Sequence, residues 1–144
     1  MPRNTTTEDP AHVKAHATGR WADILFRALS SRVAKRWKFV SFRGSKKGEW
    51  RGIVDVLAVR KSTASPDHAP LKRGDLFDII LVQLKGGSAP APTAEDCARL
   101  KAVAKQYGAK HVVQFAWKKG VSSKFCKLNR RLKWEQTTAA ELFA

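Results

Sequence analysis

The spacing of hydrophobic residues changes several times along the chain, and each change predicts a new element. In RWADILFRALSSRVAKRW (20–37) the apolar residues recur at helical spacing, which predicts an amphipathic helix. Its expected buried face consists of Trp21, Ile24, Leu25, Ala28 and Leu29. The next apolar segments are short, rich in β-branched and aliphatic residues and separated by polar turns, so they predict strands at 38–42, 52–61 and 75–85.

The second half of the chain predicts another helix and another strand. TAEDCARLKAVAKQYG opens with Thr93-x-x-Asp96, a variant of the capping box, and ends at Gly108, a residue suited to a helix C-terminus. The expected apolar face of this helix consists of Leu100, Val103, Ala104 and Tyr107. A strand at 110–117 and a basic extension follow, and Thr138-x-x-Glu141 predicts a short last helix.

The order of these elements predicts an α/β protein with an αβββαβ core, in which helices flank a mixed central sheet. The strands at 38–61 and 75–85 are expected to form an antiparallel meander, and the strand–helix–strand at 75–117 a right-handed crossover between parallel strands. We expect one domain over residues 18–144 and a flexible N-terminal tail over residues 1–17.

The charge of the chain predicts a polyanionic partner. It has 28 Lys and Arg against 12 Asp and Glu, a net charge of +16 and a pI near 10.5. An anionic membrane surface is the competing partner, but no long basic amphipathic helix is present, and no run reaches the roughly 20 apolar residues that span a bilayer. The N-terminus lacks the apolar core of a signal peptide. We therefore expect a cytoplasmic, nucleoid-associated protein that binds nucleic acid.

Cysteine and histidine offer little chemistry. Cys97 and Cys126 lack any CxxC or zinc-type spacing and are expected to be reduced packing residues. His12 and His16 are four residues apart and could chelate a metal on a helix, but their polar, terminal segment favours a disordered lead-in.

Three polar residues interrupt the apolar strands. Asp55 lies within IVDVL, and Gln83 and Lys85 end the run DIILVQLK on one face of the same strand. Burying such groups is costly unless they have partners. If the two strands are neighbours, a carboxylate, an amide oxygen and an ammonium converge. The two oxygens suit Mg²⁺, and the ammonium could orient or deprotonate a water or stabilise charge on a phosphate.

These residues also carry a resemblance to a known superfamily. Val54-Asp55 and Gln83-x-Lys85, with a helix before them and a helix and strand after, resemble the PD-(D/E)xK nucleases, and the glutamine is similar to the QxK variant of Mrr-type restriction endonucleases. The stretch SFRGSKKGEWRGIVDVLAV is similar to Holliday-junction resolvases. The resemblance covers about residues 18–117. It implies a restriction-endonuclease-like fold, a Mg²⁺ cofactor that Mn²⁺ can replace, duplex or branched DNA as substrate, and a homodimer.

The resemblance also implies roles for individual residues. Asp55, Gln83 and Lys85 would be catalytic, and Asp55, Gln83 and the Leu84 carbonyl would hold the metal. Val54 stands in place of the usual proline, and Gln83 in place of the usual acid, so the site has one negative charge fewer. The missing carboxylate could come from Asp23, in Gly19-x-x-x-Asp23 where related enzymes have Glu, or from Glu49.

Two basic runs, interleaved with aromatic residues, are expected to contact phosphates. Their candidate residues are Arg43, Ser45, Lys46, Lys47, Arg51, Lys118, Lys119, Lys124, Lys127, Arg130 and Arg131. Three alternatives stay open at this point. Asp55 and Lys85 could form a structural ion pair, the chain could be a catalytically inactive nucleic-acid-binding module on the same fold, or it could be a basic RNA-associated protein.

Overall fold

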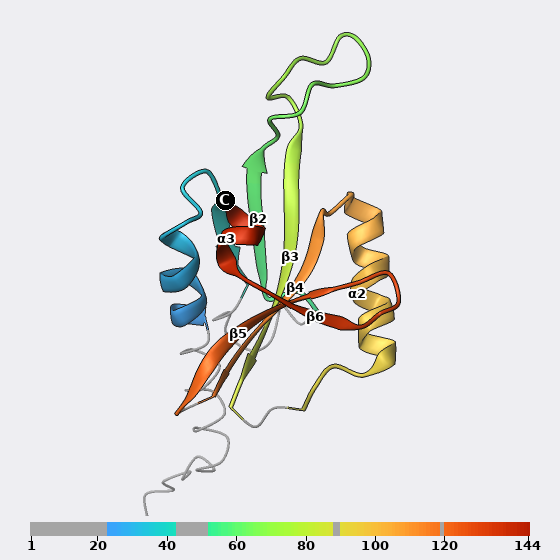
Figure 1. Ribbon diagram of the computed structural model, residues 1–144. Coiled ribbons are helices and arrows are strands. Elements are labelled where there is room, and N and C mark those ends of the chain that lie inside the picture. The colour runs from blue at the N-terminus through green and yellow to red at the C-terminus, as the bar shows by residue number, and fades with distance from the viewer. Residues whose placement is uncertain (1–22, 43–51, 88–89, 119) are drawn as a thin grey trace, which may run out of the picture.

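A six-stranded sheet forms the centre of the molecule (Figure 1). The computed structural model describes residues 23–42, 52–87, 90–118 and 120–144. The strands lie side by side in chain order and are β1 (Lys38–Ser41), β2 (Val56–Lys61), β3 (Phe77–Gly86), β4 (His111–Lys118), β5 (Val121–Leu128) and β6 (Trp134–Thr137). β3 and β4 are parallel, and the other neighbouring pairs are antiparallel.

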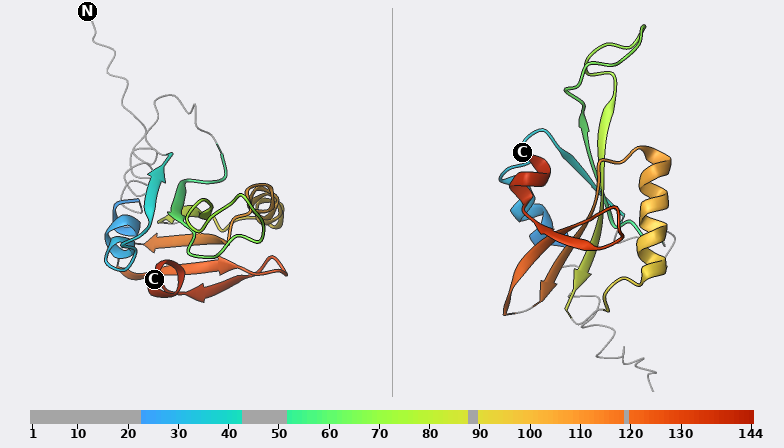
Figure 2. Two further views of the ribbon diagram at one scale, coloured as in Figure 1. Left: turned by 90° about the horizontal axis from the view of Figure 1, so that it is seen from above. Right: turned by 45° about the vertical axis from the view of Figure 1, so that its right-hand side comes forward.

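Helices cover both faces of this sheet (Figure 2). A helix whose described part is residues 23–31 packs on one face together with α3 (Ala139–Phe143), and α2 (Ala94–Tyr107) packs on the other. The predicted α/β class, the antiparallel meander and the parallel pair joined by a helix are therefore confirmed. The predicted tail over residues 1–17 lies outside the described residues. None of the helices in the described segments is long and apolar enough to cross a membrane.

Phe26 is the centre of the core between the first helix and the sheet. It is fully buried, and Phe39, Phe115 and Phe143 approach it with ring centroids 5.4 to 6.1 Å away in edge-on geometry. Such aromatic pairs stabilise a core beyond their buried area. The side of the helix that carries Phe26 therefore faces the sheet.

The predicted buried face of the first helix is thus partly wrong. Ile24 is 45% exposed and Ala28 is exposed, whereas Ser30, one turn after Phe26, is fully buried. Leu25 and Leu29 lie at the margin of the core, and Trp21 lies outside the described residues. Two faces of this helix carry apolar residues. The face that contains Phe26 is the buried one, because it packs against the aromatic residues of the sheet.

The capping box of α2 is present in both directions. The Thr93 hydroxyl accepts from the Asp96 amide at 3.1 Å, and the Asp96 carboxylate accepts from the Thr93 amide at 3.2 Å. Gly108 ends the helix in the left-handed conformation, with φ of 63°, where glycine is unstrained. The buried residues are Cys97, Leu100 and Ala104; both cysteines of the chain are free.

The prediction that Tyr107 lies on the buried face of α2 is wrong, because this side chain is 67% exposed. It is the last residue of the helix, and its ring borders an apolar depression of about 270 Å³ beside the sheet. Val54, Leu57 and Ile79 line the same depression. The Tyr107 ring therefore borders this depression at the edge of the α2 core and stays mostly in solvent.

The basic extension that the sequence predicts after residue 117 is instead part of the sheet. β5 and β6 add two antiparallel strands beside β4, and the short last helix follows as predicted, with Thr138 at its N-cap. Lysines lie on both faces of VSSKFCKL, at positions 124 and 127, so this segment does not alternate between apolar and polar residues as a half-buried strand does. Phe125 nevertheless points into the core. The sequence prediction for β2 is also too long, because the strand begins at Val56 and Asp55 precedes it.

Candidate active site

Asp55 contacts the backbone of β3 on both sides of Gln83. Its amide donates to the Val82 carbonyl at 2.9 Å, and its Oδ2 accepts from the Leu84 amide at 2.8 Å. Its own carbonyl accepts from the Phe42 amide at 2.9 Å, which ties the end of β1 to the same point. The chain therefore holds the Asp55 carboxylate directly beside the Gln83–Leu84 peptide.

Gln83 belongs to a row of polar residues that crosses the sheet. In register, Gln83 lies opposite Gln114 on β4, Gln114 opposite Cys126 on β5, and Cys126 opposite Gln136 on β6. Paired residues share one face of a sheet, and this is the α2 face, because Leu81 lies two residues before Gln83 and packs with α2.

Gln114 was not among the predicted site residues, although the sequence contains a pattern that indicates it. HVVQFAW holds a lone amide within an apolar strand, as DIILVQL does. Gln114 is 9% exposed, and its Nε2 is buried without a hydrogen-bond partner among the described residues. The Oε1 of Gln83 is buried and unpartnered in the same sense. A native core rarely leaves such atoms unsatisfied, so both atoms call for a further polar partner, which an ordered water, an ion or a contact between the two amides can supply.

Lys85 begins a second row one step further along the strands. It lies opposite Ala116, which lies opposite Lys124, so two ammonium-bearing side chains flank a small residue on the α2 face. The two strand spacings between them amount to roughly 10 Å. Lys85 is partly buried and Lys124 is exposed. Burial raises the pKa of the Cys126 thiol, and the charge of Lys124 offsets part of that rise.

Asp23 has its described contacts on the other side of the sheet. Its Oδ2 accepts from the Ser41 hydroxyl at 3.0 Å, and its Oδ1 accepts from Arg27 Nε at 3.2 Å. Ser41 lies opposite Val56, which belongs to the core beneath the first helix. The structure therefore places Asp23 on the face opposite to Gln83. Its role as a metal ligand stays a prediction.

The described residues among those predicted to contact phosphates lie on more than one face of the sheet. Arg43, Ser45, Lys46, Lys47, Arg51 and Lys119, together with Glu49, lie outside the described residues. Of the others, Lys118, Lys124, Arg130 and Arg131 are exposed, but Lys127 lies opposite Val113 and thus on the face away from Lys124. The aromatic residues between them are core residues: Phe125 is 8% exposed, and Trp134 packs against the α2 cluster.

The donors around Asp55 fit a hard cation in kind. The Asp55 carboxylate and the buried, unpartnered Gln83 Oε1 are oxygen atoms, as Mg²⁺ prefers. A cation beside them would satisfy the Gln83 oxygen. The described segments contain no group of three His, Cys, Asp or Glu residues that could hold a metal by themselves.

The fold that carries this geometry has a counterpart among solved structures. The chain is similar to Hjc of Archaeoglobus fulgidus, a Holliday junction resolvase from an archaeal hyperthermophile, with a TM-score of 0.52 and 13% sequence identity. The match covers 88% of this chain and 100% of that chain. No protein-family model matches the sequence, and no curated protein matches it either. At this identity the likeness concerns the fold, and it confirms the restriction-endonuclease-like class predicted from the sequence.

Proposed function

We propose that this protein is a Mg²⁺-dependent DNA endonuclease of the PD-(D/E)xK superfamily, in the QxK variant, acting on branched DNA in the manner of a junction resolvase. One observation carries the proposal: the Asp55 carboxylate lies against the Gln83–Leu84 peptide, on a fold similar to that of a resolvase. The net charge of +16 supports a DNA substrate. A four-way junction has two-fold symmetry, so we expect the active species to be a homodimer.

Each residue of the site has a distinct task in this proposal. Asp55, the Gln83 amide oxygen and the Leu84 carbonyl would hold the cation. Glu49 would complete its ligands, or Asp23 would do so after leaving its bonds with Ser41 and Arg27 on the opposite face. A bound Mg²⁺ supplies charge stabilisation for the phosphate that is cleaved. The ammonium of Lys85 lies two residues from Gln83 on the same face and would position the attacking water or stabilise charge on the phosphate. Lys124, in the Lys85 row, adds positive charge on the path of the DNA.

The proposal is tested by cleavage of matched DNA substrates. Wild-type protein should cleave a synthetic four-way junction in Mg²⁺ or Mn²⁺ and not in EDTA, with linear duplex and single strands as comparisons. Asp55→Asn keeps an oxygen for the Leu84 amide, and Lys85→Gln keeps most of the length of the side chain. Both variants should fold and lose cleavage. An active Asp55→Asn or Lys85→Gln variant would exclude this site, and wild-type protein that cleaves none of the substrates would exclude the activity.

A second candidate function is a nucleic-acid-binding module that keeps the fold without catalysis. The replacement of the usual acid by Gln83, together with the absence of a three-acid cluster in the described residues, favours it. In this case Asp55→Asn should bind the junction as well as or better than the wild type, because a repelling charge is removed. Calorimetric titration with Mn²⁺ separates the two candidates, since only the nuclease should bind the ion in an Asp55-dependent manner.

A further inference from the structure

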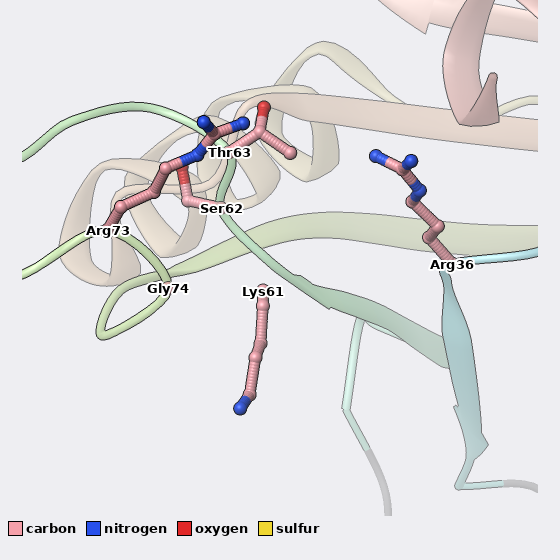
Figure 3. Close-up of a pocket in the computed structure, with 6 residues that line it drawn as sticks. All are labelled: Arg36, Lys61, Ser62, Thr63, Arg73 and Gly74. Carbon is pink, nitrogen blue, oxygen red and sulfur yellow. The ribbon is translucent and has the colours of Figure 1, made fainter.

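A basic cavity that is largely open to solvent lies beside the end of β2 and the loop that leads to β3, at the opposite end of β2 from Asp55 (Figure 3). Its volume is about 560 Å³, and its lining residues are Arg36, Lys61, Ser62, Thr63, Arg73 and Gly74. They come from three separate segments: the turn after the first helix, the end of β2 with the residues after it, and the loop before β3. The lining therefore combines three cations and two hydroxyl groups with no carboxylate.

The three cations have no acidic partner within the described residues. No carboxylate oxygen there lies within 4.0 Å of Arg36, Lys61 or Arg73. The neighbouring cations are paired: Arg60 Nε lies 2.9 Å and Lys110 Nζ lies 3.5 Å from the carboxylate of Asp78. The positive charge of the cavity is thus left for an anion from outside the chain. Arg, Lys, Ser and Thr are among the side chains that contact phosphate oxygens.

The backbone around the cavity is held in place before any ligand arrives. The Ser62 amide donates to the Leu76 carbonyl at 2.8 Å, which extends the pairing of β2 and β3 to the rim of the cavity. The Ala64 amide donates to Ser62 Oγ at 3.2 Å and fixes the turn that follows. On the other side, the Arg60 guanidinium lies 4.6 Å from the ring centroid of Trp37, the residue after Arg36. A preorganised site loses less entropy when it binds.

We infer that this cavity binds a backbone phosphate of the DNA at a distance from the bond that is cleaved. The inference rests on the proposed function for its choice of DNA as the source of the phosphate. Asp55 immediately precedes β2 and Lys61 ends it, which at about 3.3 Å per residue places the cavity roughly 20 Å away. That is about six base pairs along a duplex, at an axial rise of about 3.4 Å per strand phosphate. The cavity thus contacts a remote part of the bound arm or a second arm.

A pair of double variants tests this inference. Lys61→Gln with Arg73→Gln removes two charges from the cavity. Arg99→Gln with Lys105→Gln removes two exposed charges from α2, of which Arg99 lies 3.8 Å from Asp96, as a control with the same change in net charge. Binding of a fluorescent four-way junction is measured by anisotropy at several KCl concentrations without divalent metal. For each phosphate that the cavity variant no longer neutralises, the slope of log K against log salt should become shallower by about 1. Its binding should weaken about tenfold at moderate salt, and the control should show neither change.

Each possible result of these measurements either supports or overturns the proposed phosphate contact. Equal salt slopes for the cavity and control variants overturn the inference. Loss of inorganic phosphate binding in the cavity variant, measured by calorimetry, together with unchanged junction binding, assigns the cavity to a small phosphate ligand and overturns the DNA contact. Since binding is measured without metal, a wild-type protein that binds but never cleaves refutes the nuclease proposal and leaves the salt-slope comparison intact. Thermal melting of both variants shows that the comparison is between folded proteins.

Discussion

Gln83 and Gln114 lie directly opposite each other on the parallel strands β3 and β4, with Oε1 of the first and Nε2 of the second both buried and unpartnered among the described residues. An acceptor and a donor thus stand side by side on one face of the sheet without a bond in the structure. A buried polar atom without a partner costs about 1–3 kcal/mol, so the row is a source of instability that a bound ligand could relieve.

Gln83→Glu should strengthen metal binding. The change places a carboxylate where the PD-(D/E)xK motif has an acid and gives the Gln114 amide a charged acceptor. We expect Mn²⁺ to bind about tenfold more tightly, equivalent to about 1.4 kcal/mol, in calorimetric titration. Gln83→Met has a similar volume but no oxygen, and serves as the control that should bind less tightly than the wild type. Unchanged affinity in both variants would show that the metal does not contact position 83.

Gln114→Leu should stabilise the protein. Leucine fills a similar space and removes the buried donor, so the free energy of unfolding should rise by about 1 kcal/mol, which is about 2–4 °C in Tm for a chain of this size. Gln136→Leu is the control, because it lies in the same row but is exposed and should change Tm little. A loss of more than about 2 kcal/mol in Gln114→Leu would mean that this amide is hydrogen-bonded in solution.

Asp55→Ala and Asp55→Asn should differ in stability. Alanine removes the acceptor of the Leu84 amide and should lower the free energy of unfolding by about 1–3 kcal/mol. Asparagine keeps an oxygen at that position and should stay within about 1 kcal/mol of the wild type. Urea unfolding measures both. Equal stability of the two variants would contradict a structural role of the Asp55–Leu84 bond. The proposed role of Asp55 in the active site would then be its only one.

The Arg60–Asp78 pair should make the protein sensitive to acid. Burial alone would raise the pKa of Asp78, but its hydrogen bond with Arg60 and the charges of Lys110 and Arg60 outweigh burial and hold the pKa below its usual 3.8. A carboxyl with a lowered folded-state pKa stabilises the fold above its unfolded pKa, and this stability is lost as the pH falls through the folded pKa.

Asp78→Asn should therefore be less stable than the wild type at pH 7, and the difference should shrink below about pH 4. Thermal melts from about pH 7 to about pH 2.5 measure this convergence. Asp67→Asn, exposed in the preceding loop, is the control that should leave the melting curve at pH 7 nearly unchanged. A stability difference that is constant over this range would show that the charge of Asp78 contributes nothing.

The sequence alone determined most of the element order, because local signals are strong where a single period or cap dominates. Thr93, Asp96 and Gly108 delimit α2 through hydrogen bonds and backbone geometry that involve only near neighbours. The apolar runs of β2 and β3, with a hairpin connection between them, left little choice but antiparallel pairing. Gln83 and Lys85 had to share a face, since side chains alternate along any strand.

Tertiary structure decided which of several equivalent patterns is used. The first helix has two apolar stripes, and the ring cluster around Phe26, contributed by β1, β4 and α3, selected one of them. Basic residues masked the strand β5, whose inward side chain, Phe125, becomes visible only when β4 pairs with it. The spacing of apolar residues predicts which side chains are exposed only where a segment packs against one neighbouring element. The first helix and β5 each pack against several elements.

For the candidate site as well, the sequence determined one part and the tertiary structure decided the other. The identities of Asp55, Gln83 and Lys85 as misplaced polar residues were evident in the chain, because charge and amide groups are rare in apolar strands. The 2.8 Å bond from the Leu84 amide to Asp55, the pairing of Gln83 with Gln114, and the position of Asp23 across the sheet depend on strand register and sidedness. Register joins residues that are far apart in the chain, so no local pattern encodes it, and only the packing of the whole sheet sets it.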